Sequence, residues 1–317
     1  MKRFINLLYV RNYTLNMFSK IKVATLIISS NTYPANRNVR AQKKIYANSK
    51  SSIYWYRQGH KDQLNGKQSN LIGNDLFLDV SDNSISMGKK TLMAFEWAEK
   101  NLDYDFIVRP TPSSFVHFSN LEKFIKKNFT LDEVVYAGTI QSTNDKYGNK
   151  LDFVSGSTLV LSKKCIQLIL ENKNLWDHSY WDDVGLAILL KKINVKAFNA
   201  DRFDVPGNPY LKNIPMDFYQ YRCRADNHYG YPRLIESHVL KYVNELSIGN
   251  KHSKFKKYFF MSLIEVSKFV YIYQFGWKVY SLIRATLRNI LPKKLYRFIK
   301  KLFSKQVESF KHIRFKT

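Results

Sequence analysis

Apolar residues in the first half of the chain occur in blocks with two spacings, one typical of buried strands and the other of helices. Short runs rich in β-branched and aromatic side chains predict strands at residues 22–30, 52–56, 75–80 and 104–109. Segment 89–101 has apolar side chains at helical spacing, and a helix is also expected at 39–47. Strands that alternate with helices predict an α/β fold with a mostly parallel sheet flanked by helices.

The second half continues the pattern and then changes character. Strands are expected at 133–140, 153–161 and 196–199, a polar loop at 141–150, and helices at 163–172, 182–192 and 232–244, with Ser162 as the cap of the first. Residues 206–232 are aromatic and loop-rich, and 247–253 have a linker composition. These boundaries predict an N-terminal extension at 1–19, a catalytic-sized domain at 20–246 and a tail at 247–317.

The composition supports a folded core and excludes several protein classes. The chain has 317 residues, of which 45% are hydrophobic, including 22 Phe and 21 Tyr. Disordered, collagen-like and disulfide-scaffold proteins are therefore excluded. The two cysteines, Cys165 and Cys223, have no metal-ligand spacing around them. A reducing cytoplasm is the expected compartment, because neither a secretory signal nor an uncharged apolar run of 18 residues is apparent.

The net charge of +26 is concentrated at the C-terminal end. Residues 251–317 contain 17 lysines and arginines against two glutamates, interleaved with bulky apolar side chains. Basic amphipathic helices of this kind lie in the interface of an anionic membrane. We therefore expect peripheral attachment at the inner face of the membrane. A helical hairpin packed on the domain is the alternative, whereas nucleic-acid binding is not expected because no RNA- or DNA-binding signature accompanies the charge.

The best-marked nucleotide and hydrolase motifs are absent, and the chemistry-bearing segments stand out by their order instead. They are a segment with Lys89 and Lys90 before a helix, YDFIVRPTPSSFVHFSNL at 104–121, FVSGSTLVLS at 153–162, WDDVG at 181–185 and YQYRCR at 219–224. This order resembles the GT-A glycosyltransferases of the β-1,3-galactosyltransferase and fringe-like kind. The resemblance covers about residues 20–240 and rests on order and spacing more than on identity.

The sequence departs from that family at its metal motif. Where the relatives place Asp-x-Asp after a strand, this chain has Arg-Pro-Thr-Pro-Ser-Ser at 109–114, and Gln220 stands where a late histidine would be sought. The leaving diphosphate needs positive charge, which metal ions or arginines can supply. We expect Arg109, Arg222 and Arg224, with hydroxyls from Ser113 and Ser114, to bind it without a metal cofactor. Mg or Mn is the alternative, and each arginine could instead be a surface charge or the partner of a nearby carboxylate.

The acidic pair Asp182 and Asp183 is the candidate catalytic group. Inverting transfer to a sugar hydroxyl requires a carboxylate that accepts the hydroxyl proton. In the relatives an acidic pair at a helix start does this, so the resemblance implies that Asp183 is the base and Asp182 supports it. A plain helix N-terminal cap is the alternative. Trp176 and Trp181 would stack on the acceptor sugar or belong to the core.

Further candidates for donor binding lie at strand ends and turns. Open α/β sheets bind ligands at the carboxyl ends of their strands, and a glycine lets the backbone approach a ligand closely. The candidates are Ser29, Ser30, Asn31, Arg37, Asp79, Lys89 and Gly156, with Asp82 as a further carboxylate. A simple strand bulge is the alternative reading of Gly156.

Together these observations predict a glycosyltransferase that transfers a hexose from a nucleotide sugar, foremost a UDP-sugar, to a glycan or lipid-linked acceptor in surface polysaccharide or capsule synthesis. The expected partners are this donor, this acceptor and an anionic membrane surface. Two rivals remain: a non-catalytic sugar-nucleotide or glycan-binding relative, and a basic nucleic-acid-associated protein.

Overall fold

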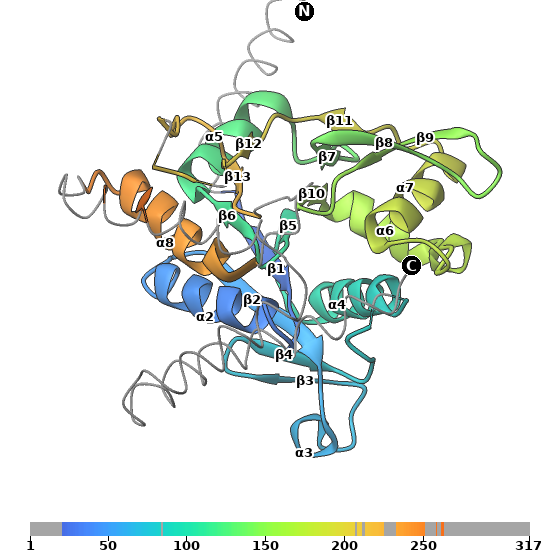
Figure 1. The fold of residues 1–317 in the computed structure, drawn as a ribbon. Helices are drawn as coiled ribbons and strands as arrows, with labels where there is room; N and C mark the ends of the chain where they lie inside the picture. Colours follow the sequence, from blue (N-terminus) through green and yellow to red (C-terminus); the bar gives the residue numbers. More distant parts are fainter. Residues whose placement is uncertain are drawn as a thin grey trace, which may run out of the picture.

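The computed structural model describes residues 21–250 except 84, 207, 211, 212 and 225–232, together with 258, 261 and 262. Its largest element is an eight-stranded sheet in the order β11-β7-β10-β5-β1-β2-β4-β3 (Figure 1). These strands are β1 (Val23–Ile28), β2 (Ser52–Gln58), β3 (Ser69–Ile72), β4 (Asp75–Leu78), β5 (Phe106–Pro110), β7 (Tyr136–Gly138), β10 (Thr158–Ser162) and β11 (Phe198–Asn199).

Most neighbouring strands in this sheet are parallel. Strand β1 pairs in parallel with both β2 and β5, and β2 pairs in parallel with β4. Strand β10 runs antiparallel to β5 and β7, and β3 runs antiparallel to β4. The prediction of an α/β fold with a mostly parallel sheet flanked by helices is therefore confirmed.

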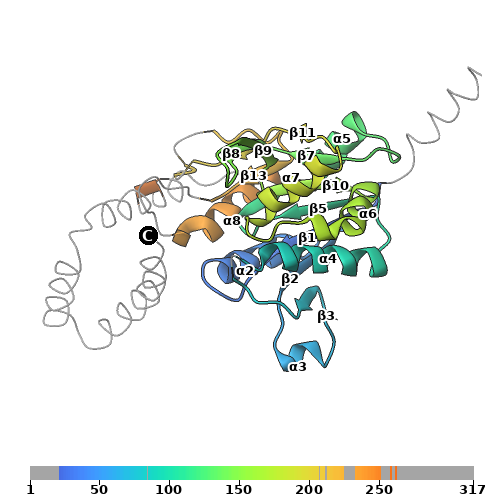
Figure 2. The ribbon, with the colours of Figure 1, turned by 90° about the vertical axis from the view of Figure 1, so that its right-hand side faces the viewer.

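Helices cover both faces of the sheet. Helices α2 (Ala35–Ile45) and α8 (Glu236–Ser247) pack together on one face, and α4 (Met87–Asn101), α6 (Lys163–Glu171) and α7 (Asp182–Lys192) cover the other (Figures 1 and 2). Side chains of β1 alternate between these layers, because successive strand residues point to opposite faces. Leu26 and Ile28 pack with the α4 layer, whereas Ile27 packs with the α2 layer.

A second, smaller sheet begins where the chain continues from the end of β5 into β6 (Ser114–Val116). It contains β6, β13 (Gln220–Arg222) and β12 (Phe203–Asp204). Strands β6 and β13 pair antiparallel, with Ser114 opposite Arg222. The remaining elements are α3 (Lys61–Leu64), α5 (Phe118–Asn128), η1 (Lys173–Leu175), η2 (Arg233–Ile235) and the hairpin of β8 (Ile140–Asn144) and β9 (Lys150–Val154).

The order in which successive strands are added to the sheet reverses between β1 and β5, although the two strands are parallel. From β1 the chain moves through β2 to β4, and after α4 it returns to the opposite side of β1 as β5. The loops that follow β1 and β5 therefore leave neighbouring parallel strands in opposite directions. In open α/β sheets the crevice at such a switch point, outside the carboxyl ends of the strands, is where ligands bind.

Several predicted boundaries are wrong. The expected polar loop at 141–150 is largely a hairpin, because β8 and β9 pair with each other from Ile140 to Val154. The single strand expected at 153–161 is two strands separated by the turn at 155–157. The loop-rich region 206–232 contains β13, whose pairing partner β6 lies about 100 residues earlier in the chain. By contrast, Ser162 caps α6 as predicted, since its Oγ accepts a hydrogen bond from the Cys165 amide.

The N-terminal extension at 1–19 and nearly all of the basic tail lie outside the described residues. Within the residues that the structure describes, no helix is long and apolar enough to cross a membrane.

Candidate active site

The two adjacent aspartates at the start of α7 lie in different surroundings. Asp182 is buried and forms an ion pair with Arg109, which is itself only 1% exposed. Asp183 is half-buried, and its Oδ2 accepts a hydrogen bond of 2.8 Å from the Gly156 amide. Its Oδ1 accepts from the Val184 amide at 3.0 Å. Within the described part of the chain, no lysine or arginine forms an ion pair with Asp183.

Arg109 is held from three directions inside the domain. Besides Asp182, its Nε donates to the Tyr56 hydroxyl at 3.0 Å and its Nη1 donates to the Gly156 carbonyl at 2.8 Å. Thr91 closes the network, because its Oγ1 lies 3.1 Å from the Tyr56 hydroxyl and 3.4 Å from Asp182 Oδ2. This environment matches the alternative considered for Arg109, a partner to a nearby carboxylate. The guanidinium orients Asp182 and the 155–157 turn.

The backbone of Gly156 lies close to the side chains of both Asp183 and Arg109. A Cβ atom at this position would lie 2.9 Å from Asp183 Oδ2 and 3.0 Å from Arg109 Nη1. Both contacts are tight enough that a side chain at this position would force the Asp183 carboxylate or the Arg109 guanidinium to shift. The close approach seen here is to two side chains of the protein, and the close approach of this backbone to a bound ligand stays a prediction.

The 155–157 turn also contacts the loop between β5 and β6, where the relatives have their metal motif. The Ser157 carbonyl accepts hydrogen bonds from Ser114 Oγ at 2.6 Å and from the Thr111 amide at 3.0 Å. Arg202, whose side chain is 5% exposed, donates from Nη1 to Ser155 Oγ at 2.8 Å and to Ser157 Oγ at 3.0 Å. The turn thus links Asp183 to Ser114. Sequence reasoning missed Arg202, since it lies in a segment without any motif.

Four of the predicted diphosphate ligands gather at this loop. Ser114 lies opposite Arg222 in the small sheet, and the Cys223 amide between the two arginines donates to the Ser113 carbonyl at 2.7 Å. Arg222 is half-buried and Arg224 is exposed. The structure therefore brings Ser113, Ser114, Arg222 and Arg224 together across more than 100 residues of sequence, and separates Arg109 from them by burying its charge.

The carboxyl end of β1 carries three predicted donor-binding residues. Ser29 is buried and donates from Oγ to the Tyr56 carbonyl at 3.1 Å. Ser30 Oγ lies 2.8 Å from Thr32 Oγ1. Asn31 is exposed and accepts from Arg57 through its Oδ1 at 3.0 Å. These residues lie on the β1 side of the switch point, as the sequence predicted.

A buried lysine that the sequence marked together with Lys89, but to which it gave no site role, supports the end of β1. Lys90, 2% exposed, donates to the Ser29 carbonyl at 3.1 Å and pairs with Asp82 at 2.8 Å. Asp82 also accepts from the Gln58 amide at 3.0 Å. Burial lowers the pKa of Lys90, while the charge of Asp82 raises it. Helical spacing to the buried Ala94 would have distinguished Lys90 from the exposed Lys89.

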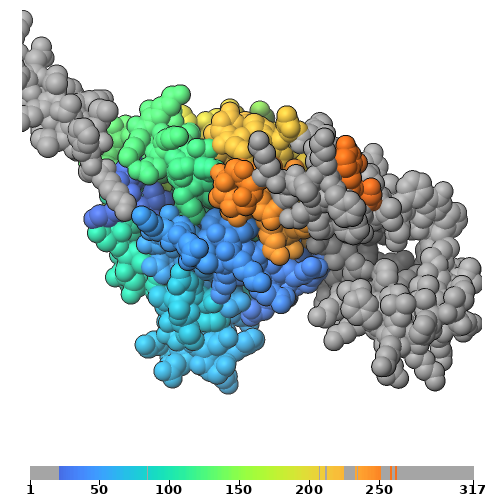
Figure 3. All heavy atoms as spheres, turned by 90° about the vertical axis from the view of Figure 1, so that its left-hand side faces the viewer, coloured from blue at the N-terminus to red at the C-terminus, as the bar shows by residue number. Residues whose placement is uncertain are grey.

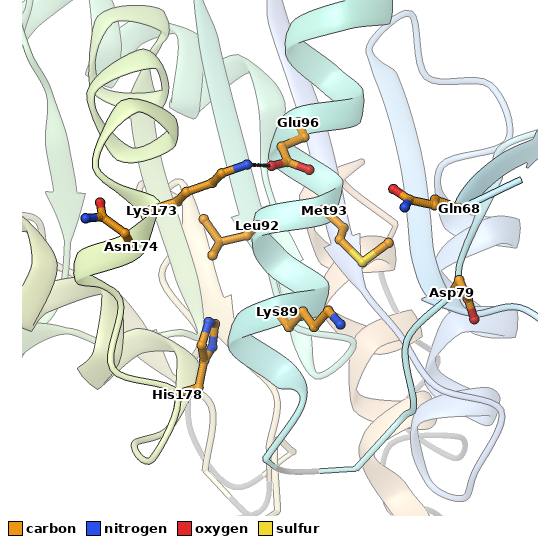
Figure 4. Close-up of a pocket in the computed structure, with 9 residues that line it drawn as sticks. All are labelled: Gln68, Asp79, Lys89, Leu92, Met93, Glu96, Lys173, Asn174 and His178. Atoms are coloured by element: carbon orange, nitrogen blue, oxygen red, sulfur yellow. Dashed lines mark hydrogen bonds and ion pairs between the residues drawn. The ribbon is translucent and has the colours of Figure 1, made fainter.

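Two other candidates lie on a different part of the surface. Asp79 and Lys89 line a depression of about 470 Å³ beside the outer side of α4 (Figure 4). Its other lining residues are Gln68, Leu92, Met93, Glu96, Lys173, Asn174 and His178. Lys173 and Glu96 form an ion pair of 2.6 Å across it. Neither Asp79 nor Lys89 contacts the network around Asp182. The remaining candidate, Arg37, lies elsewhere: it is exposed in the first turn of α2.

The two tryptophans near the acidic pair differ in exposure. Trp176 is 4% exposed and packs in the core, whereas Trp181, directly before the pair, is 63% exposed. Only Trp181 of these two could therefore stack on a sugar.

Among the residues that the structure describes, no group of three or more histidine, cysteine and acidic side chains is arranged to hold a metal ion.

Comparison with known proteins gives structural likenesses alone. No protein-family model matches the chain, and no curated protein is significantly similar to it in sequence. A solved glycosyltransferase involved in glycosylation of the major capsid of PBCV-1 is 10% identical, with a TM-score of 0.40 over 69% of this chain and 99% of that one. The galactosyltransferase LgtC, solved with donor and acceptor sugar analogues, is 11% identical with a TM-score of 0.37, over 69% of this chain and 95% of that one. The glycosyltransferase GlyE of Streptococcus pneumoniae is 12% identical with a TM-score of 0.39, over 74% of this chain and 65% of that one. These likenesses are too low to indicate a shared activity by themselves.

Proposed function

We propose that this protein is a glycosyltransferase that moves a hexose from a nucleotide sugar, foremost a UDP-sugar, to a glycan or lipid-linked acceptor. One observation carries the proposal. The 155–157 turn connects Asp183, a carboxylate without a cationic partner in the described part of the chain, to the β5–β6 loop with Ser114. A candidate proton acceptor and a candidate diphosphate site thus contact the two ends of one hydrogen-bonded turn.

Asp183 is the better base of the acidic pair. A carboxylate that is paired with a buried guanidinium, as Asp182 is, has its charge neutralised and little access to a substrate. Asp183 is half-buried, and two backbone amides fix its orientation without neutralising it. A group that must accept a proton from an incoming hydroxyl needs such a fixed but accessible position. Asp182 then acts as a positioning residue through Arg109.

In the proposed reaction the acceptor hydroxyl gives its proton to Asp183 as its oxygen forms a bond to the anomeric carbon. The bond from that carbon to the phosphate oxygen breaks, and the nucleoside diphosphate leaves. Its charge would be stabilised by Arg222 and Arg224. The hydroxyl protons of Ser113 and Ser114 are already donated to Glu236 and to the Ser157 carbonyl, so these two serines hold the loop in place. Attack opposite the leaving group inverts the configuration at the anomeric carbon.

The switch point between β1 and β5 is the natural place for the nucleotide. Ser30 and Asn31 follow β1, and Ser113 and Ser114 follow β5. A nucleoside that contacts the β1 loop would present its phosphates to the β5 loop, because the two strands are neighbours. The exposed Trp181 offers a flat apolar surface for the acceptor sugar next to the base. A role in surface polysaccharide synthesis and attachment to an anionic membrane through the tail complete the proposal.

Asp183→Asn tests this assignment. The amide keeps the shape of the carboxylate but cannot accept the proton, so we expect turnover to fall by about 100-fold or more. Donor binding, measured by calorimetry with UDP, should stay near the wild-type value. Asp132→Asn is the control, because the Asp132 side chain is 92% exposed on the surface. Turnover that survives in Asp183→Asn would exclude this residue as the base.

A further inference from the structure

A buried polar cluster fastens α8 to the loop after β5. Glu236, the first residue of α8, is 0% exposed, and its Oε2 accepts hydrogen bonds from Ser113 Oγ at 2.8 Å and Asn38 Nδ2 at 2.7 Å. Asn38 belongs to α2, which lies directly beside α8 on this face of the molecule (Figure 3). A carboxylate at this depth requires a cationic partner, since an isolated buried charge is very costly.

Arg233 is that partner, and it reaches from the cluster toward solvent. Its Nε donates to Glu236 Oε1 at 2.6 Å, and its Nη2 donates to Glu236 Oε2 at 3.0 Å and to Ser113 Oγ at 2.7 Å. Its side chain remains 36% exposed. Glu236 therefore holds one edge of the guanidinium in a fixed orientation, and no described residue accepts a hydrogen bond from Nη1.

Two buried polar atoms of the same cluster lack a hydrogen-bond partner within the described part of the chain. They are the Tyr33 hydroxyl and Asn38 Oδ1, and Asn38 is 0% exposed. Burial raises the pKa of Tyr33 to about 12; the charge of Glu236 raises it as well, whereas the nearby guanidinium groups of Arg37 and Arg233 lower it. The phenol thus stays protonated at neutral pH and can donate a hydrogen bond. Arg37 is close to the Tyr33 hydroxyl, although no described partner lies within hydrogen-bond geometry. Buried polar atoms are rarely left unpaired in folded proteins, so these two indicate a missing partner.

The cluster lies at the switch point of the sheet. Tyr33 belongs to the loop after β1, and Ser113 belongs to the loop after β5. Among the described residues of this cluster, two arginines, Arg37 and Arg233, lie beside the one carboxylate of Glu236. An anion with several oxygen atoms, together with hydroxyl groups able to donate to Asn38 Oδ1, would satisfy the unpaired atoms and the excess positive charge.

We propose that Arg233, Arg37 and Tyr33 bind the diphosphate of the nucleotide, with Glu236 as the residue that positions Arg233. The proposal rests on the proposed function and deepens it, because it adds Arg233 and Arg37 to the arginines proposed to bind the diphosphate. Arginine suits this role, since its planar guanidinium forms paired hydrogen bonds to phosphate and stays charged at every relevant pH. The sequence predicted the diphosphate ligands to be Arg109, Arg222 and Arg224 and included Arg37 among the donor-binding candidates, but nothing in the local sequence marks Arg233.

Calorimetric titration with UDP, inorganic pyrophosphate and uridine tests the proposal. Arg37→Ala should weaken binding of UDP and pyrophosphate by about 10- to 100-fold, the effect of losing a charge-assisted hydrogen bond. Binding of uridine, which has no phosphate, should change little. Arg40→Ala is the matched control, because Arg40 is an exposed arginine one turn later on α2.

Arg233 needs a pair of variants, since its loss alone would leave Glu236 buried without a cation. Arg233→Lys keeps the charge and loses the paired geometry. The double variant Arg233→Met/Glu236→Gln removes both charges, and its thermal unfolding shows whether it folds. We expect both to weaken binding of UDP and pyrophosphate by at least about 10-fold while sparing uridine.

Wild-type affinity for both phosphates in Arg37→Ala and Arg233→Lys would overturn the proposal, as would a wild-type protein that binds neither. Equal losses in Arg40→Ala and Arg37→Ala would also overturn it, because the effect would then be general electrostatics. Failure of the proposed function looks different. In that case the phosphates bind and respond to these variants, but no nucleotide sugar supports transfer.

Discussion

Replacing each member of the acidic pair by asparagine should affect two different properties of the protein: its stability in one variant and its activity in the other. Asp182 is buried against Arg109, whereas Asp183 is half-buried and faces the Gly156 amide. Asp182→Asn leaves the guanidinium of Arg109 buried without a counter-charge, although the amide oxygen can still accept one hydrogen bond. Asp183→Asn removes a carboxylate that forms no ion pair with a described lysine or arginine. The first variant should therefore lose stability, and the second should lose activity.

The size of the stability loss follows from burial. Removing one partner of a buried ion pair costs about 3–5 kcal/mol in the free energy of unfolding. A domain of this size shifts its Tm by about 2–4 °C per kcal/mol. Asp182→Asn should thus lower the Tm by about 6–20 °C. Asp183→Asn alters hydrogen bonds to two backbone amides at a half-buried site, so its cost should stay near 1 kcal/mol and its Tm change below about 4 °C.

Thermal unfolding and donor turnover, measured on the same preparations, separate the two effects. Turnover of Asp182→Asn should be read well below its Tm, so that the folded fraction is the same as in the wild type. Equal Tm values for Asp182→Asn and the wild type would refute the idea that the Arg109 pair stabilises the site. A larger Tm loss in Asp183→Asn than in Asp182→Asn would show that the roles within the pair are reversed.

Three further perturbations address the turn, the metal and the tail. Gly156→Ala should lower turnover by at least about 10-fold, because its Cβ would press on Asp183 and Arg109 at 2.9 and 3.0 Å. Gly148→Ala is its control, since that position has open space around it and adds only the strain of a positive φ; similar activity losses in both would count against a specific role for the turn. EDTA should leave turnover unchanged, and activity that is abolished by EDTA and restored by Mn would contradict a metal-independent donor site. Truncation after residue 250 should release the protein from anionic vesicles while donor hydrolysis persists; equal vesicle binding by both forms would contradict the membrane anchor.

The local pattern was sufficient for the elements that build the sheet. Strands such as β1 and β5 are continuous apolar runs between turn residues, and α7 begins at an acidic pair, so each is marked within its own few residues. The order of these elements also indicated an α/β fold. The apolar pattern did not predict strands in polar segments that are stabilised by pairing with another strand, as in the β8–β9 hairpin.

The tertiary structure decides which charged side chains are buried in ion pairs and which remain accessible to a ligand. Arg109 and Arg222 look equivalent in the sequence, yet one is buried against Asp182 and the other lies half-buried beside Ser114. Glu236 reaches Asn38 across 198 residues. Whether a charge is neutralised, exposed or aimed at a ligand depends on groups brought near it by packing. The electrostatic energy of a side chain depends on distance and burial, and neither is encoded by neighbours along the chain.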